Sequence, residues 1–280
     1  MSTTVERTTG DRAGEPAGGR AGKRAATSTA ARRITALGRA ELTLFGRSRG
    51  MLVGALVVPL VLPFSARTVV EDMDLAENGL SVGLVLLPGA IGFSLLFAVY
   101  SALVSVFVGR REELVLKRLR TGELTDPEIL AGTSLPAVVT GLVQSLVLVA
   151  GCTALLDVPA PEAAPLAVLG LLLGLVLCAA LAAVTAGFTR TVESAQATAL
   201  PLVMVSMIGS GVMIPLELAP DRVASVFELL PLSPVITLVR GGWTGQLSGY
   251  EALGACATAL AWTVIAVFAV RRWFRWEPRR

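Results

Sequence analysis

The sequence predicts an all-α membrane protein with six transmembrane helices. Hydrophobic residues make up 54% of its 280 residues and charged residues only 16%, whereas about a quarter of the residues in soluble domains are charged. The apolar residues fall into long blocks without charge, which favours membrane spans over a two-sided core. A spanning helix needs about 20 apolar residues. The predicted spans cover about residues 50–66, 80–108, 129–156, 164–188, 195–216 and 251–270, and together they form one six-helix domain over 50–270.

Two segments precede the first span. Residues 1–27 are rich in Gly, Ala, Thr and Arg and contain no apolar run, so we expect a disordered, basic cytoplasmic tail and no signal peptide. In residues 28–49, Ile34 and Leu37 lie on one side of a helical pattern with arginines elsewhere, although Glu41 interrupts the apolar stripe. This mixture predicts an amphipathic helix in the membrane interface. A solvated helical lead-in to the first span is the alternative.

Prolines mark the irregular parts of the predicted domain. Pro59 and Pro63 predict that the first span is short or kinked, and Pro88 predicts a bend near the outer end of the second. Between the fifth and sixth spans, residues 217–251 are too polar to span a membrane and too apolar for a free loop. Short re-entrant helices that dip into the outer leaflet are therefore predicted, since irregular backbone at that depth is tolerated only against protein or a water-filled cavity.

The distribution of basic residues predicts the orientation. If the N-terminus is cytoplasmic, the inner segments 1–49, 110–128, 190–193 and 271–280 hold 21 of the 24 Lys and Arg residues. Short cytoplasmic loops carry an excess of Lys and Arg. Both termini are therefore predicted to be cytoplasmic, and residues 271–280 form a second basic tail.

The composition argues against several kinds of chemistry. The chain has no histidine, which removes His-based catalytic pairs and His metal sites. Its three cysteines lie inside apolar blocks without C-x-x-C spacing, so they are interpreted as small buried hydrophobes. No phosphate-binding loop of the G-x-x-x-x-G-K-[ST] type is present. The residues at 46–50 match a G-x-S-x-G elbow by letter, but that elbow needs a strand, a helix and a His partner. No catalytic site, metal site or cofactor is predicted.

The segment 110–128 is the most charged run between two spans. Each Arg, Lys or Asp costs about 2.5–3.5 kcal/mol at the centre of a membrane helix on insertion scales, so this segment must lie in water. Glu113 and Lys117 can pair at i,i+4 spacing. We interpret the segment as the surface on which a soluble partner acts. A solvated loop that follows the positive-inside rule is the alternative.

Three stretches, in order, resemble the type-2 ABC exporter permeases, most of all those of the daunorubicin type. The first is REELVLKRLRTGELTDPEILAG, in which Gly122-Glu123 replaces the usual Thr-Pro pair. The others are GSGVMIPLELAP, with Gly211 and Pro215, and LLPLSPVITLVRG, with Pro231, Pro234 and Arg240. The positions that match the first pattern are Glu112, Glu113, Leu116, Arg118, Leu119, Arg120, Leu124, Glu128 and Gly132. The resemblance covers about residues 30–275.

The resemblance implies the permease subunit of an ATP-driven exporter in the plasma membrane, with no ATPase site of its own. Two permease copies, with a homodimer expected, would move an amphiphilic drug, antibiotic or lipid outward. ATP and Mg²⁺ would bind a separate ATP-binding cassette subunit, and no nucleic acid is involved. The residues expected to couple that subunit to the spans, through a cytoplasmic coupling helix between spans 2 and 3, are Arg111, Glu112, Glu113, Lys117, Arg118, Leu119, Arg120 and Glu128.

The resemblance also implies a substrate path between the second and fifth spans of the two copies. Its candidate lining residues are Phe93, Phe97 and Tyr100 in one copy and Met204, Met207 and Ser210 in the other, although each could simply pack against a neighbouring helix or lipid. An outer gate would include Pro215, Glu217, Pro231, Pro234 and Arg240. Gln144, in contrast, is expected to form a hydrogen bond between helices.

Two alternative functions for a membrane protein are an ion-driven secondary transporter and a non-transporting scaffold. An ion-driven secondary transporter would place ionisable groups at mid-membrane, and the charge-free blocks contain none. A non-transporting membrane scaffold is compatible with the same sequence.

Overall fold

The computed structural model describes residues 81–121, 124–212, 221–274 and 276, and the isolated positions 39, 43 and 61. All regular elements in this part of the chain are helices, which confirms the all-α prediction. Five helical segments are long and apolar enough to cross a membrane, and they correspond to five of the six predicted spans. The predicted tail 1–27, interfacial helix 28–49 and first span 50–66 lie outside the described residues apart from those isolated positions.

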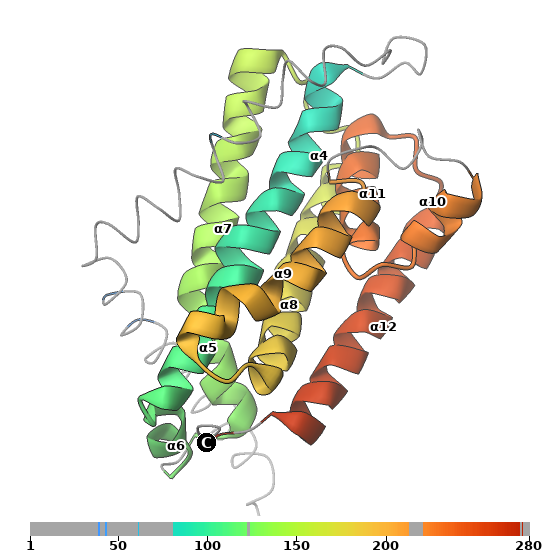
Figure 1. The fold of residues 1–280 in the computed structure, drawn as a ribbon. Helices are drawn as coiled ribbons and strands as arrows, with labels where there is room; N and C mark the ends of the chain where they lie inside the picture. The colour runs from blue at the N-terminus through green and yellow to red at the C-terminus, as the bar shows by residue number, and fades with distance from the viewer. Residues whose placement is uncertain are drawn as a thin grey trace, which may run out of the picture.

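One continuous helical segment, Val82–Glu112, forms the centre of the bundle (Figure 1). It consists of α4 (Val82–Ser94), a π-helix η2 (Leu95–Ser101) and α5 (Ala102–Glu112). In an apolar stretch of 18 residues of this segment, 78% of the residues are buried. In the corresponding stretch of the last spanning helix, α12 (Gly249–Trp273), only 17% are buried. The helix runs through Pro88 without ending. The π-helix at mid-span is notable because such segments are rare and are frequent at functional sites.

Three further spanning helices pack around this centre: α7 (Asp126–Leu156), α8 (Ala164–Phe188) and α9 (Val192–Gly209). Two glycines of α8, Gly170 and Gly174, lie where neighbouring helices approach closely. A Cβ at Gly170 would lie 2.8 Å from Cβ of Leu238, and one at Gly174 would lie 2.7 Å from side-chain atoms of Leu95 and Val235. Small residues in membrane helices allow such approach. Hydrogen at these two positions therefore lets α8 lie directly against α11 and η2.

Two short helices connect α9 to α12: α10 (Asp221–Phe227) and α11 (Ser233–Thr244). Pro231, Pro234 and most of α11 are buried, because α11 packs between α8, α12 and α4. The N–H of Ala163 donates to the carbonyl of Gly242 at 2.9 Å and ties α11 to the start of α8. That α10 and α11 dip into the outer leaflet stays a prediction, and Pro215 and Glu217 of the predicted gate lie outside the described residues.

The cysteines are free. Cys152 and Cys178 are buried, as predicted, and Cys256 is partly exposed on α12.

Candidate functional site

The predicted docking segment forms a sharp corner at one end of the bundle. Its short helix α6 (Val115–Arg120) follows α5 after a turn, and it lies at the end of the bundle where α12 also ends (Figure 1). Leu114, between the two helices, has φ 59°. A non-glycine residue in this left-handed region costs about 1–2 kcal/mol, so packing must hold the corner in place. The opposite end of the bundle carries α10 and α11.

The packing that holds α6 comes from its apolar side. Leu116 is fully buried and Leu119 is partly buried, whereas Lys117, Arg118 and Arg120 are exposed, together with Glu112 and Glu113 just before the helix. The helix is therefore fixed to the bundle by leucines and presents charges of both signs to solvent. The predicted Glu113–Lys117 pair is not among the ion pairs found in the described part of the chain.

Arg111 occupies a different environment from the one predicted. Its side chain is fully buried, so it does not lie on an exposed docking surface. Its guanidinium donates to the carbonyls of Ala186 at 2.8 Å, Thr189 at 2.6 Å and Arg190 at 3.3 Å. The last carbonyls of a helix lack intrahelical partners and carry a partial negative charge. Arg111 therefore caps the C-terminus of α8 from the end of α5.

Glu112 makes the complementary contact. Its carboxylate accepts a hydrogen bond from the N–H of Val192, the first residue of α9, at 3.3 Å. An anion is favourable at a helix N-terminus, as a cation is at a C-terminus. Adjacent residues of opposite charge thus attach the α5 end to both sides of the turn between α8 and α9. We call this pair, Arg111 and Glu112, the α5 clamp.

The other side of the segment is joined to α7 and the chain after α12. The guanidinium of Arg120 lies 3.0 Å from the carboxylate of Asp126 and 5.2 Å from the ring centroid of Trp276. Glu128, predicted as a coupling residue, is buried and accepts hydrogen bonds from the N–H and hydroxyl of Thr125 at 2.7 and 2.9 Å. This is the reciprocal arrangement of a capping box. Glu128 therefore fixes the start of α7 and is not exposed to a partner.

The candidate path residues fall into two environments. Phe93 and Phe97 are partly exposed and stack with ring centroids 4.3 Å apart, and Met204 and Met207 of α9 are exposed and partly exposed. Tyr100, in contrast, is fully buried, and its hydroxyl lies 2.9 Å from that of Thr185. Tyr100 thus packs inside the bundle and does not line an open surface.

Ser210 is fully buried at the end of α9, and its hydroxyl has no hydrogen-bond partner among the residues that the structure describes. It is followed by Gly211, which has φ 71°. The carbonyl of Gly211 accepts a hydrogen bond from the guanidinium of Arg240 at 3.2 Å. Arg240, predicted as part of the gate, is itself buried in α11. It therefore links α11 to the segment that leaves α9.

A stripe of hydroxyl groups on the central helix joins it to its neighbours. Ser94 donates to Gln144 of α7 at 2.9 Å, which confirms the predicted interhelical role of Gln144. Ser101 donates to Gln196 of α9 at 2.8 Å, and Gln196 donates to Ser105 at 3.1 Å. Sequence reasoning missed this contact between the second and fifth spans. The signal was present, because residues seven and four apart lie on one face of a helix.

The comparisons with known proteins agree with this architecture. A family model described as ABC-2 type transporter matches residues 32–243 of the 280-residue chain. No curated protein matches the sequence significantly. The matched range covers the described spans from α4 to α9 as well as α6 and α11. With five apolar spanning helices in its described part, the chain belongs to the ABC-2 type transporter family and is a multi-pass membrane permease.

Proposed function

We propose that the chain is the permease subunit of an ATP-driven exporter that moves an amphiphilic drug, antibiotic or lipid out of the cell. Membership of the ABC-2 family supports the permease role. In this proposal a separate ATP-binding cassette subunit docks on α6 and carries ATP and Mg²⁺, and a second copy of the chain completes the pathway. The resemblance to daunorubicin-type permeases supports an amphiphilic cargo.

The observation that carries the proposal is the combination of α6 and the α5 clamp. The exposed charges of α6 provide a surface for a soluble partner, and its buried Leu116 transmits any displacement to the bundle. Because Arg111 and Glu112 attach the same corner to the ends of α8 and α9, a force on α6 reaches three spans together. A solvated loop would need none of these contacts.

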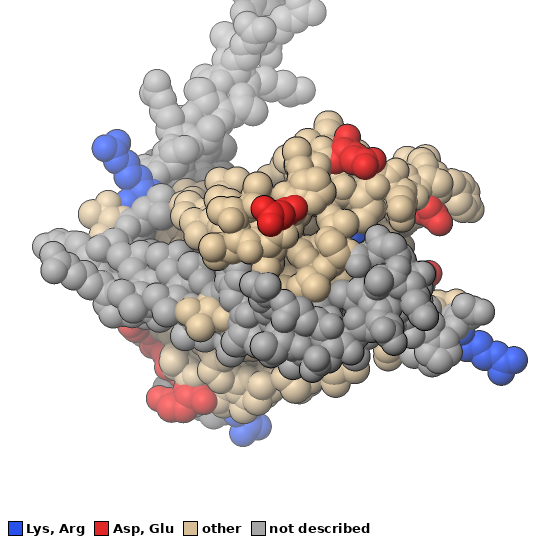
Figure 2. Space-filling view, turned by 90° about the horizontal axis from the view of Figure 1, so that it is seen from above, with Lys and Arg blue, Asp and Glu red and all other residues tan. Residues whose placement is uncertain are grey.

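The distribution of Lys and Arg between the two ends supports the proposed orientation. The end with α6 carries Arg110, Lys117, Arg118, Arg120, Arg190, Arg271 and Arg272. At the other end, the exposed residues Asp157, Glu162, Glu228 and Glu251 are accompanied by Arg222. Figure 2 looks onto this second end and shows acidic side chains spread over its surface. Under the positive-inside rule, α6 then faces the cytoplasm, where ATP is available.

The cargo would pass between the second and fifth spans of two copies. Phe93, Phe97, Met204 and Met207 supply apolar and aromatic surface for an amphiphile in this proposal. The hydrogen bonds of Ser101 and Ser105 with Gln196 place α5 and α9 side by side. A movement of α6 would therefore act on both helices of the proposed path.

The experiment is ATP-dependent daunorubicin uptake into inverted vesicles that contain the chain and a co-expressed ATP-binding cassette subunit. The test variant is the double reversal Glu113→Arg with Arg118→Glu, which keeps the net charge. We expect ATP hydrolysis to persist while transport is lost, with normal membrane insertion. The matched control, Arg222→Glu with Glu228→Arg at the far end, should transport normally.

Normal transport by the test variant would show that the α6 surface is not the coupling site. Uptake driven by an ion gradient without the ATP-binding subunit would replace the proposal with the secondary-transporter alternative.

A further inference from the structure

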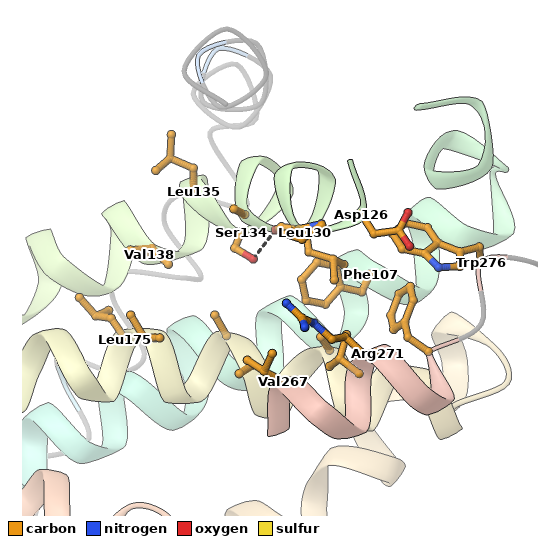
Figure 3. A pocket seen from close by; sticks show the side chains of 18 residues that line it. Phe107, Asp126, Leu130, Ser134, Leu135, Val138, Leu175, Val267, Arg271 and Trp276 are labelled. Carbon is orange, nitrogen blue, oxygen red and sulfur yellow. Dashed lines mark hydrogen bonds between the residues drawn. The ribbon is translucent and has the colours of Figure 1, made fainter. Parts of the chain in front are cut away.

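A long cavity lies between α7, α8 and α12, away from the proposed path. Its volume is about 740 Å³, within the range of sites that hold drug-sized ligands. Most of its lining residues come from one side of each of these helices (Figure 3). They are Leu130, Ala131, Ser134, Leu135 and Val138 of α7, Leu175, Val176, Ala179, Ala180 and Ala183 of α8, and Val267, Val270 and Arg271 of α12.

The cavity has the length of one leaflet of a membrane. Its lining on α7 extends from Asp126 to Val138, which is about 18 Å at 1.5 Å per residue. Half of the hydrocarbon core of a bilayer is about 15 Å. Away from the end where α7 begins, the walls are aliphatic, apart from Ser134, whose hydroxyl donates to the carbonyl of Leu130 at 2.7 Å. An extended alkyl chain fits this shape and chemistry.

The end of the cavity nearest α6 is aromatic. Phe107 and Phe274 make an edge contact with ring centroids 6.4 Å apart, and Phe274 makes another with Trp276 at 5.0 Å. Tryptophan is enriched at the level of lipid headgroups. The aromatic groups therefore mark the boundary between the hydrocarbon core and the interface, at the end where α7 begins and α12 ends.

A cation projects into the cavity just inside this boundary. Figure 3 shows the side chain of Arg271 directed between Phe107 and Val267, toward the apolar part. Among the described residues no carboxylate pairs with Arg271; that of Asp126, also at this end, lies 3.0 Å from Arg120 instead. A guanidinium matches a phosphate in geometry as well as in charge. An anionic group beside the alkyl chain would thus complete the site.

From these observations we propose that the cavity binds one anionic glycerophospholipid as a resident ligand. Its phosphate lies at Arg271 and one acyl chain follows α8 between α7 and α12. The site is separate from the path between the second and fifth spans. Only the assignment to the cytoplasmic leaflet rests on the orientation given under the proposed function.

The test is native mass spectrometry of the full chain, purified in mild detergent and incubated with phosphatidylglycerol or phosphatidylcholine. The wild-type protein should retain phosphatidylglycerol in preference to phosphatidylcholine. Arg271→Gln should lower phosphatidylglycerol retention about fivefold, since one basic residue near an anionic surface contributes about this factor. Arg272→Gln is the matched control, because Arg272 lies next to Arg271 in the chain but does not line the cavity. This variant should retain lipid like the wild type.

A second variant, Ala180→Phe, fills the cavity and should reduce the retention of both lipids. Should this variant fail to fold, the comparison of Arg271→Gln with Arg272→Gln decides alone, because both side chains are exposed. Equal retention by these two variants, or no preference for phosphatidylglycerol, would overturn the proposal. So would undiminished retention in a folded Ala180→Phe variant, since the lipid would then bind outside the cavity. The assay uses neither ATP nor transport, so its failure would not bear on the exporter function.

Discussion

Replacement of Arg111 by methionine tests the α5 clamp. The side chain is fully buried and makes two short hydrogen bonds, at 2.6 and 2.8 Å, and one longer one, at 3.3 Å. Hydrogen bonds to charged groups contribute about 1.5–3 kcal/mol each. The variant leaves the carbonyls of Ala186 and Thr189 without these donors, but it also removes the desolvation cost of a buried cation. We expect a net loss of about 3 kcal/mol.

The loss can be measured as a shift of the thermal unfolding midpoint in detergent. The intrinsic fluorescence of the four tryptophans reports the transition. For a domain of this size, 1 kcal/mol corresponds to roughly 2–4 °C, so Arg111→Met should lower Tm by roughly 6–12 °C. Arg111→Lys keeps the charge but lacks the planar fork of donors, so it should lose about half as much.

The matched control is Arg118→Met. Arg118 is exposed on α6, and surface substitutions usually change stability by about 0.5 kcal/mol or less. If the Tm of Arg111→Met lay within about 2 °C of the Tm of Arg118→Met, the structural role assigned to Arg111 would be refuted. A difference of 2 °C corresponds to roughly 0.5–1 kcal/mol, the scale of a surface change. The end of α5 would then not depend on its bonds to α8.

Two further predictions concern contacts between helices. Gln144→Leu should lower the free energy of unfolding by about 1 kcal/mol, the scale of interhelical hydrogen bonds in membranes. Adding Ser94→Ala should cost little more, because both partners of the buried bond are then gone. Additive Tm losses in detergent would contradict this coupling. Gly242→Ala should be strongly destabilising, because its Cβ would lie 2.5 Å from the backbone nitrogen of Ala167. Gly254→Ala serves as the control, because its Cβ would meet no atom within 4 Å. Equal Tm values for the two variants would show that the α8–α11 contact is looser than described.

The middle of each described span could be predicted from sequence, and so could both ends of α8 (Ala164–Phe188) and the last residue of α7, but the other ends could not. Charge-free blocks locate the apolar middle, whereas the helices extend into charged residues at their caps. Asp126 begins α7, and Glu193 lies in the first turn of α9. At the end of α12, Arg271 and Arg272 belong to the last turn. Acidic residues are favourable at helix starts and basic ones at helix ends, so a search that stops at charges shortens these helices.

The candidate site was predictable in position but not in the role of each residue. The sequence predicts the charged segment between α5 and α7, and Lys117 and Arg118 are exposed on it. It also places Arg111 on this surface, because a sequence does not distinguish an exposed arginine from one that caps a distant helix 75 residues later. The same applies to Glu128, which caps its own helix. Tertiary contacts, absent from any local pattern, decide both cases.

The π-helix at Leu95–Ser101 gave no recognisable signal either. Its residues are common in ordinary helices, and six of the seven are buried against the surrounding spans.

The central claim is that α6 lies in the cytoplasm and receives the ATP-binding subunit. The most direct measurement is labelling of Lys117→Cys with a membrane-impermeant maleimide, in a background in which Cys152, Cys178 and Cys256 are replaced by alanine. We predict labelling in inverted vesicles but not in intact cells, and protection when the ATP-binding subunit is co-expressed. Labelling in intact cells, or no protection by the subunit, would contradict the claim.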